Sequence, residues 1–223
     1  MNQIEYSLRH QKLWLLAEFG ALFIGVPAVI AAGWFPVLVI PVLLMMAVGC
    51  GLTLRWGYHL RLADLLRVRL PVWEWLRILA IFVVALPCMM EFLWLIKPEA
   101  LFGLVQNHPK IWLLVMIAYP VLSVLPQELI YRAFFFERYR PIFGGGYGML
   151  LGSAAVFSFG HIIFHNWPSV LLTFIGGLLF GRTYQRTTSL VLVSVEHALY
   201  GCAVFTLGYG QYFLDGTLRL FHQ

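Results

Sequence analysis

Three ionisable side chains interrupt long apolar stretches in the second half of this 223-residue chain: Glu128, His161 and His197. An ionisable group in a membrane-like stretch is costly and by default marks a function. A carboxylate and two imidazoles are also the groups that activate a water molecule. One of them takes a proton from the water, while the others stabilise the developing oxyanion or ligate a metal. If their helices converge, the sequence predicts a hydrolytic site.

Two further residues lie beside this set in the sequence. Arg132 follows Glu128 by four residues, so on a helix both share a face. A buried ion pair that only fixes helix packing is the alternative interpretation, although such a pair rarely adds net stability. Glu196 directly precedes His197, and Gln127 directly precedes Glu128; neighbours in a helix point about 100° apart. Their adjacency in sequence therefore does not by itself predict a hydrogen-bonded Glu196–His197 pair.

The histidines allow more than one interpretation. A lone histidine in a membrane can simply hydrogen-bond across helices. His161 and His165 have an i, i+4 spacing that two metal ligands would need, but no glutamate follows His161, so the metalloprotease helix pattern is absent. His161, His197 and Glu128 could together form a zinc site with an open water position. They could equally work without a metal, so the sequence leaves both cofactor assignments, zinc or none, open.

The composition shows what kind of scaffold must carry these residues. The chain is 61% hydrophobic and 11% charged, against about 45–50% and about 25% in ordinary soluble domains. One globular core of this size cannot hide so much apolar surface. A soluble, a disordered and a disulfide-scaffolded secreted protein are therefore excluded. The expected fold class is all-α, a polytopic transmembrane bundle of about seven to eight membrane helices.

The apolar runs predict seven spans of the length that a bilayer requires. They cover about residues 13–35, 37–54, 78–96, 111–132, 147–164, 168–186 and 189–207. The leucines of the basic segment 55–77 suggest an amphipathic helix at the membrane surface. We expect one integral-membrane domain, with N-terminal helices and the basic cytoplasmic segment in 1–109, a catalytic-type core in 110–207 and a short tail in 208–223.

Basic residues indicate how the spans are oriented. The chain carries a net charge of +5, and its arginines and lysines cluster at the N-terminus and in segments 55–77, 132–140 and 182–186. With seven spans these regions fall on one side, which the positive-inside rule makes the cytoplasm. We expect a bacterial-type inner membrane with a cytoplasmic N-terminus. No basic run with interleaved aromatics predicts a nucleic-acid partner.

Some polar and small residues have packing as their simplest role. Glu18 and Glu91 have no partner nearby in sequence and are expected either to reach the membrane surface or to pair with a distant arginine. The glycine pairs Gly148-x-x-x-Gly152 and Gly177-x-x-x-Gly181 allow helices to approach closely.

At the ionisable residues the sequence resembles the CPBP family, which comprises CAAX prenyl proteases and bacteriocin-processing, Abi-type enzymes. That family has a Glu-Glu-x-x-x-Arg motif, then Phe-x-x-x-His, then His-x-x-x-Asn. The corresponding segments here are Gln127-Glu128-x-x-x-Arg132, Phe157-x-x-x-His161 and His197-x-x-x-Gly201. The resemblance covers about residues 110–205. It implies an all-helical intramembrane endopeptidase in which Glu128, His161 and His197 hold the attacking water.

Two positions depart from the family pattern. Gln127 stands where the family has the glutamate usually assigned to water activation, and an amide cannot act as a general base. Gly201 stands where the family has an asparagine that would donate to the oxyanion. Either Glu128 has taken over, or Glu196 contributes, or hydrolysis has been lost.

The favoured function is therefore hydrolysis of a peptide bond in a membrane-associated protein or peptide. The alternative is a non-catalytic scaffold or regulator built on the same helices, which Gln127 and Gly201 motivate. A proton-coupled transporter is disfavoured because matching broken helices in two halves are missing. Membrane lipid and a membrane-associated peptide or protein are the expected partners.

One geometric condition must be met for any of these sites. If the span 111–132 ends at Arg132, Glu128 lies near one membrane face and His161 nearer the other. The two can meet if the spans tilt strongly, or if a separate, deeply placed helix begins at Pro126. A proline at the first helical turn makes a helix start at Pro126 plausible.

Overall fold

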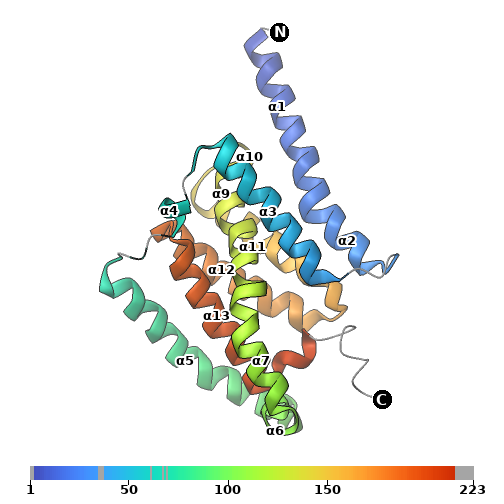
Figure 1. The fold of residues 1–223 in the computed structure, drawn as a ribbon, viewed down its shortest axis with the longest axis vertical. Coiled ribbons are helices and arrows are strands. Elements are labelled where there is room, and N and C mark those ends of the chain that lie inside the picture. The colour runs from blue at the N-terminus through green and yellow to red at the C-terminus, as the bar shows by residue number, and fades with distance from the viewer. Residues whose placement is uncertain (1–2, 35–37, 61, 67, 69, 214–223) are drawn as a thin grey trace.

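The computed structural model describes residues 3–34, 38–60, 62–66, 68 and 70–213, and every regular element in these ranges is helical (Figure 1). The elements in chain order are α1 (Gln3–Phe19), the π-helical η1 (Gly20–Gly25), α2 (Val26–Ala31), α3 (Val39–Gly57), α4 (Leu62–Leu65), α5 (Val72–Ile96), the 3₁₀-helical η2 (Pro98–Ala100), α6 (Gly103–Asn107), α7 (Pro109–Tyr119), the π-helical η3 (Pro120–Val124), α8 (Leu125–Glu128), the π-helical η4 (Leu129–Phe134), α9 (Phe135–Arg138), α10 (Arg140–Phe143), α11 (Gly146–Phe159), the 3₁₀-helical η5 (Gly160–Phe164), α12 (Trp167–Thr187), α13 (Leu190–Leu207) and the 3₁₀-helical η6 (Tyr209–Tyr212).

The predicted polytopic helical bundle is confirmed. Within the described residues, six helical runs are long and apolar enough to cross a membrane: His10–Ala31, Val39–Gly57, Val72–Ile96, Pro109–Arg138, Gly146–Phe164 and Leu190–Leu207. The remaining predicted span, at 168–186, is a helix too, namely α12. Its last two turns carry Arg182, Gln185 and Arg186, which make it more polar than the other six.

The helices differ greatly in how far the protein itself covers them. In α13, 61% of the most apolar window is buried inside the bundle, against 11% in α5. Figure 1 shows α11, α12 and α13 at the centre, while α1 and α5 lie at the periphery. The outer helices expose large apolar side chains such as Trp14, Val83 and Leu95. Such surfaces suit lipid, and α13 is the helix best shielded from it.

Glycines permit the close approach of the central helices. A methyl group added at Gly177 of α12 would come within 2.9 Å of the Ala154 backbone in α11, and one at Gly181 within 2.8 Å of Leu150. At Gly148 and Gly152 the added group would meet Phe143 of α10 at 2.6 and 2.7 Å. The two predicted small-residue pairs therefore both lie in tight contacts.

Two ion-pair clusters attach peripheral helices to this centre. Glu18 of α1 accepts from Arg138 of α9 through both carboxylate oxygens, at 2.7 and 2.9 Å. This is the distant arginine partner that the sequence allowed. On α5, the buried Glu74 contacts Arg77 and also Arg186 of α12, each at 3.2 Å. The Glu74 cluster lies near the start of α5, where charged groups are less costly than in mid-membrane, whereas Glu18 lies well inside the run His10–Ala31 and meets Arg138 at the end of its span.

The helix that carries Glu128 has no break at Pro126, so the separate helix considered above does not form. The elements α7, η3, α8, η4 and α9 follow one another without interruption from Pro109 to Arg138. π-Helical turns insert an extra residue and often accompany helix bends. One of them, η3, begins at Pro120. Because the span continues to Arg138, ten residues beyond Glu128, Glu128 lies about 15 Å from that end rather than near it.

The basic segment 55–77 does not form the amphipathic helix that its leucines suggested. The helix α3 continues to Gly57, and α5 already begins at Val72. In the described part of the connection between them, only α4 is helical. His59 has a positive φ of 54°, a conformation that does not continue an α-helix, and Pro71 precedes the first turn of α5.

The tight contact at Gly177 predicts that Gly177→Ala lowers stability. Overpacking costs about 1–3 kcal/mol, more than the roughly 1 kcal/mol that alanine gains over glycine within a helix. Thermal unfolding of the purified protein in detergent measures this difference. The matched control is Gly49→Ala in α3, where nothing lies within 4 Å of the added methyl group. Equal melting temperatures for the two variants would contradict the packing argument.

Candidate active site

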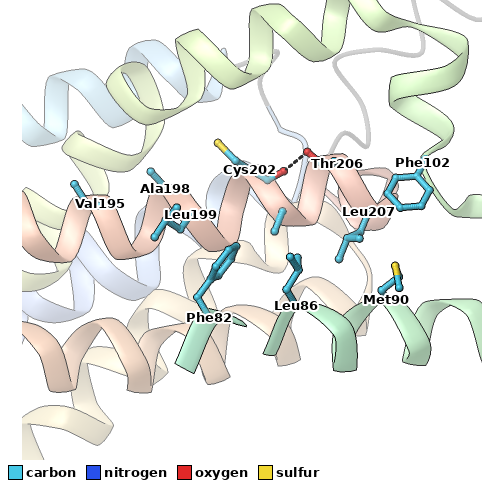
Figure 2. A pocket seen from close by; sticks show the side chains of 11 residues that line it. Phe82, Leu86, Met90, Phe102, Val195, Ala198, Leu199, Cys202, Thr206 and Leu207 are labelled. Atoms are coloured by element: carbon cyan, nitrogen blue, oxygen red, sulfur yellow. Dashed lines mark hydrogen bonds between the residues drawn. The ribbon is translucent and has the colours of Figure 1, made fainter. Parts of the chain in front are cut away.

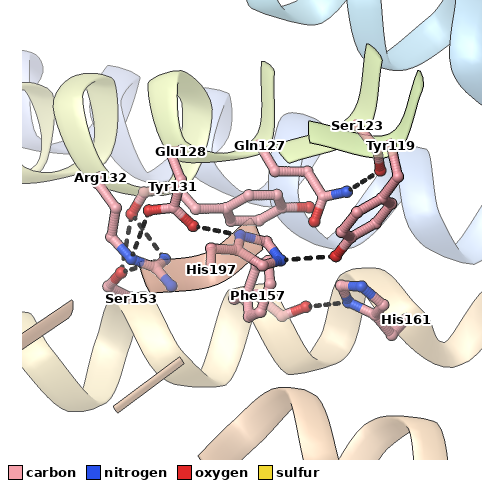
Figure 3. A network of polar contacts seen from close by, with 10 residues as sticks. All are labelled: Tyr119, Ser123, Gln127, Glu128, Tyr131, Arg132, Ser153, Phe157, His161 and His197. Carbon is pink, nitrogen blue, oxygen red and sulfur yellow. Dashed lines mark hydrogen bonds and ion pairs between the residues drawn. The ribbon is translucent and has the colours of Figure 1, made fainter. Parts of the chain in front are cut away.

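Glu128 lies at the centre of a polar network inside the bundle (Figure 3). It projects from α8, about two thirds of the way along the Pro109–Arg138 span, and its side chain is 0% exposed. Its Oε1 atom lies 2.7 Å from Nδ1 of His197 on α13. Its Oε2 atom lies 3.4 Å from Nε of Arg132, the residue four positions along the same helix. The carboxylate therefore has one partner from another helix and one from its own.

His197 connects Glu128 to a hydroxyl group. Its Nε2 atom lies 3.1 Å from the Tyr119 hydroxyl. A carboxylate only accepts hydrogen bonds, so Nδ1 carries the proton that faces Glu128. In the neutral imidazole, Nε2 is then the acceptor and Tyr119 donates to it. Phe180 stacks on the imidazole at 4.5 Å between ring centroids, and the edge contact of Phe157 at 5.5 Å also fixes its orientation.

Arg132 is held by neutral groups as well as by Glu128. Its Nη1 atom donates to Ser153 Oγ of α11 at 3.1 Å and to the Tyr131 carbonyl at 3.3 Å. The guanidinium carbon lies 4.9 Å from the centroid of the Phe157 ring, a cation–π distance. Arg132 is 0% exposed. The ion pair that the i, i+4 spacing predicted is therefore present, and it is fully buried.

His161 belongs to the same region but does not contact Glu128. It lies in η5, and its Nδ1 atom is 2.7 Å from the Phe157 carbonyl. The ring of Phe157 makes edge contacts with both histidine rings, and the two imidazoles are close enough to interact electrostatically. No hydrogen bond from a described residue involves its Nε2 atom. Of the three predicted site residues, Glu128 and His197 thus meet directly, and His161 lies across Phe157.

Helix geometry explains why the two histidines have different partners. At 1.5 Å per residue, Glu128 lies about 15 Å from the Arg138 end of its span. His161 lies fifteen residues from Gly146, the start of its own span at that same end of the bundle, or about 22 Å. Tyr119 is nineteen residues from Arg138, at about 28 Å. His161 therefore reaches a depth between Glu128 and Tyr119.

The remaining predicted supporting residues occupy different surroundings. Gln127 donates from Nε2 to Ser123 Oγ at 2.6 Å, while its buried Oε1 atom has no hydrogen-bond partner among the described residues. Gly201 is buried on α13, directly against the ring of Tyr119. Glu196 is buried in the vicinity of Thr183, and it is close enough to Glu128 to interact with it electrostatically.

Tyr119 and Ser153 escaped the sequence analysis. Both are ordinary in membrane helices, and neither lies in a motif. The one available signal for Tyr119 is its spacing: Tyr119, Ser123 and Gln127 follow one another at intervals of four, which places three polar side chains along one side of an apolar helix. Ser153 lies in the run Gly152-Ser153-Ala154, and such a run of small residues is typical of a helix-packing contact.

The three predicted ligands do not form a metal site in this arrangement. Within the described residues, no group of three His, Cys, Asp or Glu side chains lies close enough together to hold a metal ion. Glu128 and His197 bind each other, and His161 directs its Nδ1 atom to the Phe157 carbonyl. A zinc ion held by these three residues would require them to rearrange, and zinc remains a prediction from the residue types.

An apolar recess lies on the other face of α13 (Figure 2). Its volume is about 550 Å³, and it opens between α5 and α13. Its lining residues are Phe82, Leu86, Met90, Phe102, Val195, Ala198, Leu199, Cys202, Ala203, Thr206 and Leu207. None of them is ionisable at neutral pH. At about 100° per residue, the lining positions 195, 199, 202 and 206 face away from His197 and Gly201.

Residues 109–203 match the family described as type II CAAX prenyl endopeptidase Rce1-like. The matched segment contains all three motifs, so the resemblance to CAAX proteases of the CPBP family is confirmed over this part of the chain. No curated protein and no solved structure matches the sequence.

The buried network predicts that Arg132→Met destabilises the protein strongly. Removing one partner of a buried ion pair costs about 3–5 kcal/mol, because the other charge is left uncompensated. The double variant Glu128→Gln/Arg132→Met removes both charges and should be more stable than Arg132→Met alone. Chemical unfolding in detergent micelles gives the free energy of unfolding of the wild type, Glu128→Gln, Arg132→Met and the double variant. Together these four proteins form a double-mutant cycle. Strictly additive effects would show that the pair does not interact.

Proposed function

From the match of residues 109–203 to Rce1-like CAAX endopeptidases, we propose that the chain is an intramembrane endopeptidase. Its substrate is a membrane-associated peptide or protein. The observation that carries the proposal is the 2.7 Å contact between Glu128 and His197. It joins a carboxylate and an imidazole from two helices in an apolar interior, where each is costly to keep.

His161 is the general base in this proposal. A backbone carbonyl only accepts hydrogen bonds, so the contact with the Phe157 carbonyl places the ring proton on Nδ1. In the neutral imidazole the Nε2 atom then carries a lone pair that can accept a proton from water. Glu128 suits this task less well, because it has no exposed surface and its oxygens face His197 and Arg132.

The reaction proceeds through a tetrahedral intermediate. As His161 Nε2 takes a proton from water, the water oxygen bonds to the carbonyl carbon, and the π electrons of the carbonyl move to its oxygen. When the carbonyl re-forms, the C–N bond breaks and the leaving nitrogen takes the proton from Nε2. The products are a carboxylic acid and an amine, and His161 returns to its neutral form.

The remaining polar groups position the reactants and balance charge. Arg132 neutralises Glu128, and Glu128 orients the His197 ring through Nδ1, which is how a carboxylate fixes a catalytic imidazole. Gln127 cannot take a proton, but its unpartnered Oε1 atom can accept a hydrogen bond from the attacking water. Gln127 therefore orients water, and His161 activates it.

A second candidate function is a non-catalytic scaffold of the same family. The amide at Gln127 favours it, and so does the Tyr119 hydroxyl, which occupies the Nε2 atom of His197. A scaffold would keep the buried network for packing alone. The two functions differ in what His161 does, because its one hydrogen bond among the described residues is to the Phe157 carbonyl and not to Glu128, Arg132 or His197.

We expect His161→Gln to reduce peptide cleavage by about 10²- to 10⁴-fold, the usual contribution of a general base. The assay reconstitutes the full chain in liposomes with a farnesylated peptide that ends in a CAAX sequence, and mass spectrometry identifies the products. Glu128→Gln and His197→Gln should lower the rate as well. His165→Gln is the matched control, since His165 is exposed and lies outside the network.

The outcomes separate the two functions. Cleavage by the wild type that is lost only in the site variants supports the protease. Equal cleavage by wild type and His161→Gln removes His161 from the mechanism. A wild-type protein that is folded in the liposomes but leaves this peptide and a panel of membrane-anchored peptides intact supports the scaffold.

A further inference from the structure

We propose that Tyr119 donates the hydrogen bond that stabilises the oxyanion, and that Gly201 is glycine because the phenol ring of Tyr119 occupies the space of a side chain at that position. This inference rests on the proposed peptidase function. It assigns a catalytic residue that lies outside all three sequence motifs.

The first argument is steric. A methyl group built on Gly201 would run into the ring and the hydroxyl of Tyr119. The ring is flanked along the same face of α13 by Phe205 at 5.3 Å and His197 at 6.1 Å between ring centroids. Any side chain at residue 201 therefore competes with Tyr119 for one volume. The family pattern places an asparagine there, whereas this chain fills the volume from the opposite helix.

The second argument concerns the hydroxyl. It lies 3.1 Å from His197 Nε2, at the outer end of the series Arg132, Glu128, His197 and Tyr119 (Figure 3). With a neutral His197, the Tyr119 hydroxyl donates to Nε2. When an oxyanion forms on the substrate, the hydroxyl can rotate about its C–O bond and donate to the charged oxygen, which is a stronger acceptor than a neutral imidazole nitrogen.

The third argument concerns position. Tyr119 lies at about 28 Å from the Arg138 end and His161 at about 22 Å, by helix rise. Tyr119 and His161 therefore both lie beyond the buried ion pair, at a level where Tyr119 is only partly buried. A donor that is to meet a substrate carbonyl has to lie at such an accessible level. Arg132 is excluded from this task because it is 0% exposed.

The test compares Tyr119→Phe with wild type in the liposome assay. Removing one oxyanion donor typically lowers kcat by about 10²- to 10³-fold. We expect that loss in kcat with KM changed less than about threefold, because phenylalanine keeps the ring and its packing. Gly201→Ala should also lower kcat, since the added methyl group displaces the ring.

A reciprocal variant distinguishes a catalytic from a structural role. In Tyr119→Ala/Gly201→Asn the ring is removed and an amide donor is placed on α13 instead. We expect kcat at least tenfold above that of Tyr119→Ala alone. Replacement of Tyr119 by 3-fluorotyrosine, a stronger hydrogen-bond donor of nearly the same shape, should change kcat and leave the melting temperature unaltered.

The inference and the proposed function fail in different ways. If wild type cleaves and Tyr119→Phe retains its kcat, Tyr119 is not the donor, although the peptidase proposal stands. If Tyr119→Phe raises KM alone, the hydroxyl binds substrate in the ground state and the inference is also overturned. If wild type does not cleave at all, the proposed function fails and this inference fails with it.

Discussion

A carboxylate without exposed surface, in a bundle whose outside faces lipid, must find its partners inside the bundle. Glu128 finds Arg132 on its own helix and His197 on α13, and Arg132 in turn binds Ser153 on α11. One buried charge thereby connects three membrane-spanning runs. The desolvation of such a charge is costly, and any helix that withdrew would leave it uncompensated. The central, well-shielded position of α13 follows from this requirement.

The parts of this arrangement that depend on local geometry could be predicted from the sequence. The Glu128–Arg132 contact follows from i, i+4 spacing, and so does the bond from His161 back to the Phe157 carbonyl. Contacts between helices could not be predicted in this way, because the spacing on one helix says nothing about which neighbour faces it. Tyr119 is the clearest case. Only the packing of α7 against α13 reveals it, because Gly201 on α13 lies directly against Tyr119, which is 82 residues earlier in the sequence.

The long helix from Pro109 to Arg138 shows a further limit of sequence patterns. The sequence allows a separate helix to begin at Pro126, since proline removes a backbone donor and clashes with the preceding turn. The chain instead adopts π-helical turns, one beginning at Pro120, and remains helical throughout. This continuity sets the depth of the site, because each turn added after Arg132 moves Glu128 farther from the membrane surface. A polar group is thus placed in the membrane interior without a free helix end, which would leave backbone groups unsatisfied.

The two departures from the family pattern, Gln127 and Gly201, are linked by the charge at residue 127 and by the side-chain volume at residue 201. A second carboxylate at residue 127 would lie beside Glu128, and two such charges in an apolar site repel each other. With Gln127 there, Arg132 alone balances the single negative charge, and the network needs no further cation at rest. His197 can then accept a hydrogen bond at Nε2, which is the bond that Tyr119 supplies. That bond requires the ring of Tyr119 to lie against α13, and it can do so because residue 201 has no side chain. In the proposed mechanism, Gln127 and Gly201 are therefore two parts of one arrangement, in which a phenol on the Glu128 helix takes the place of a donor on α13.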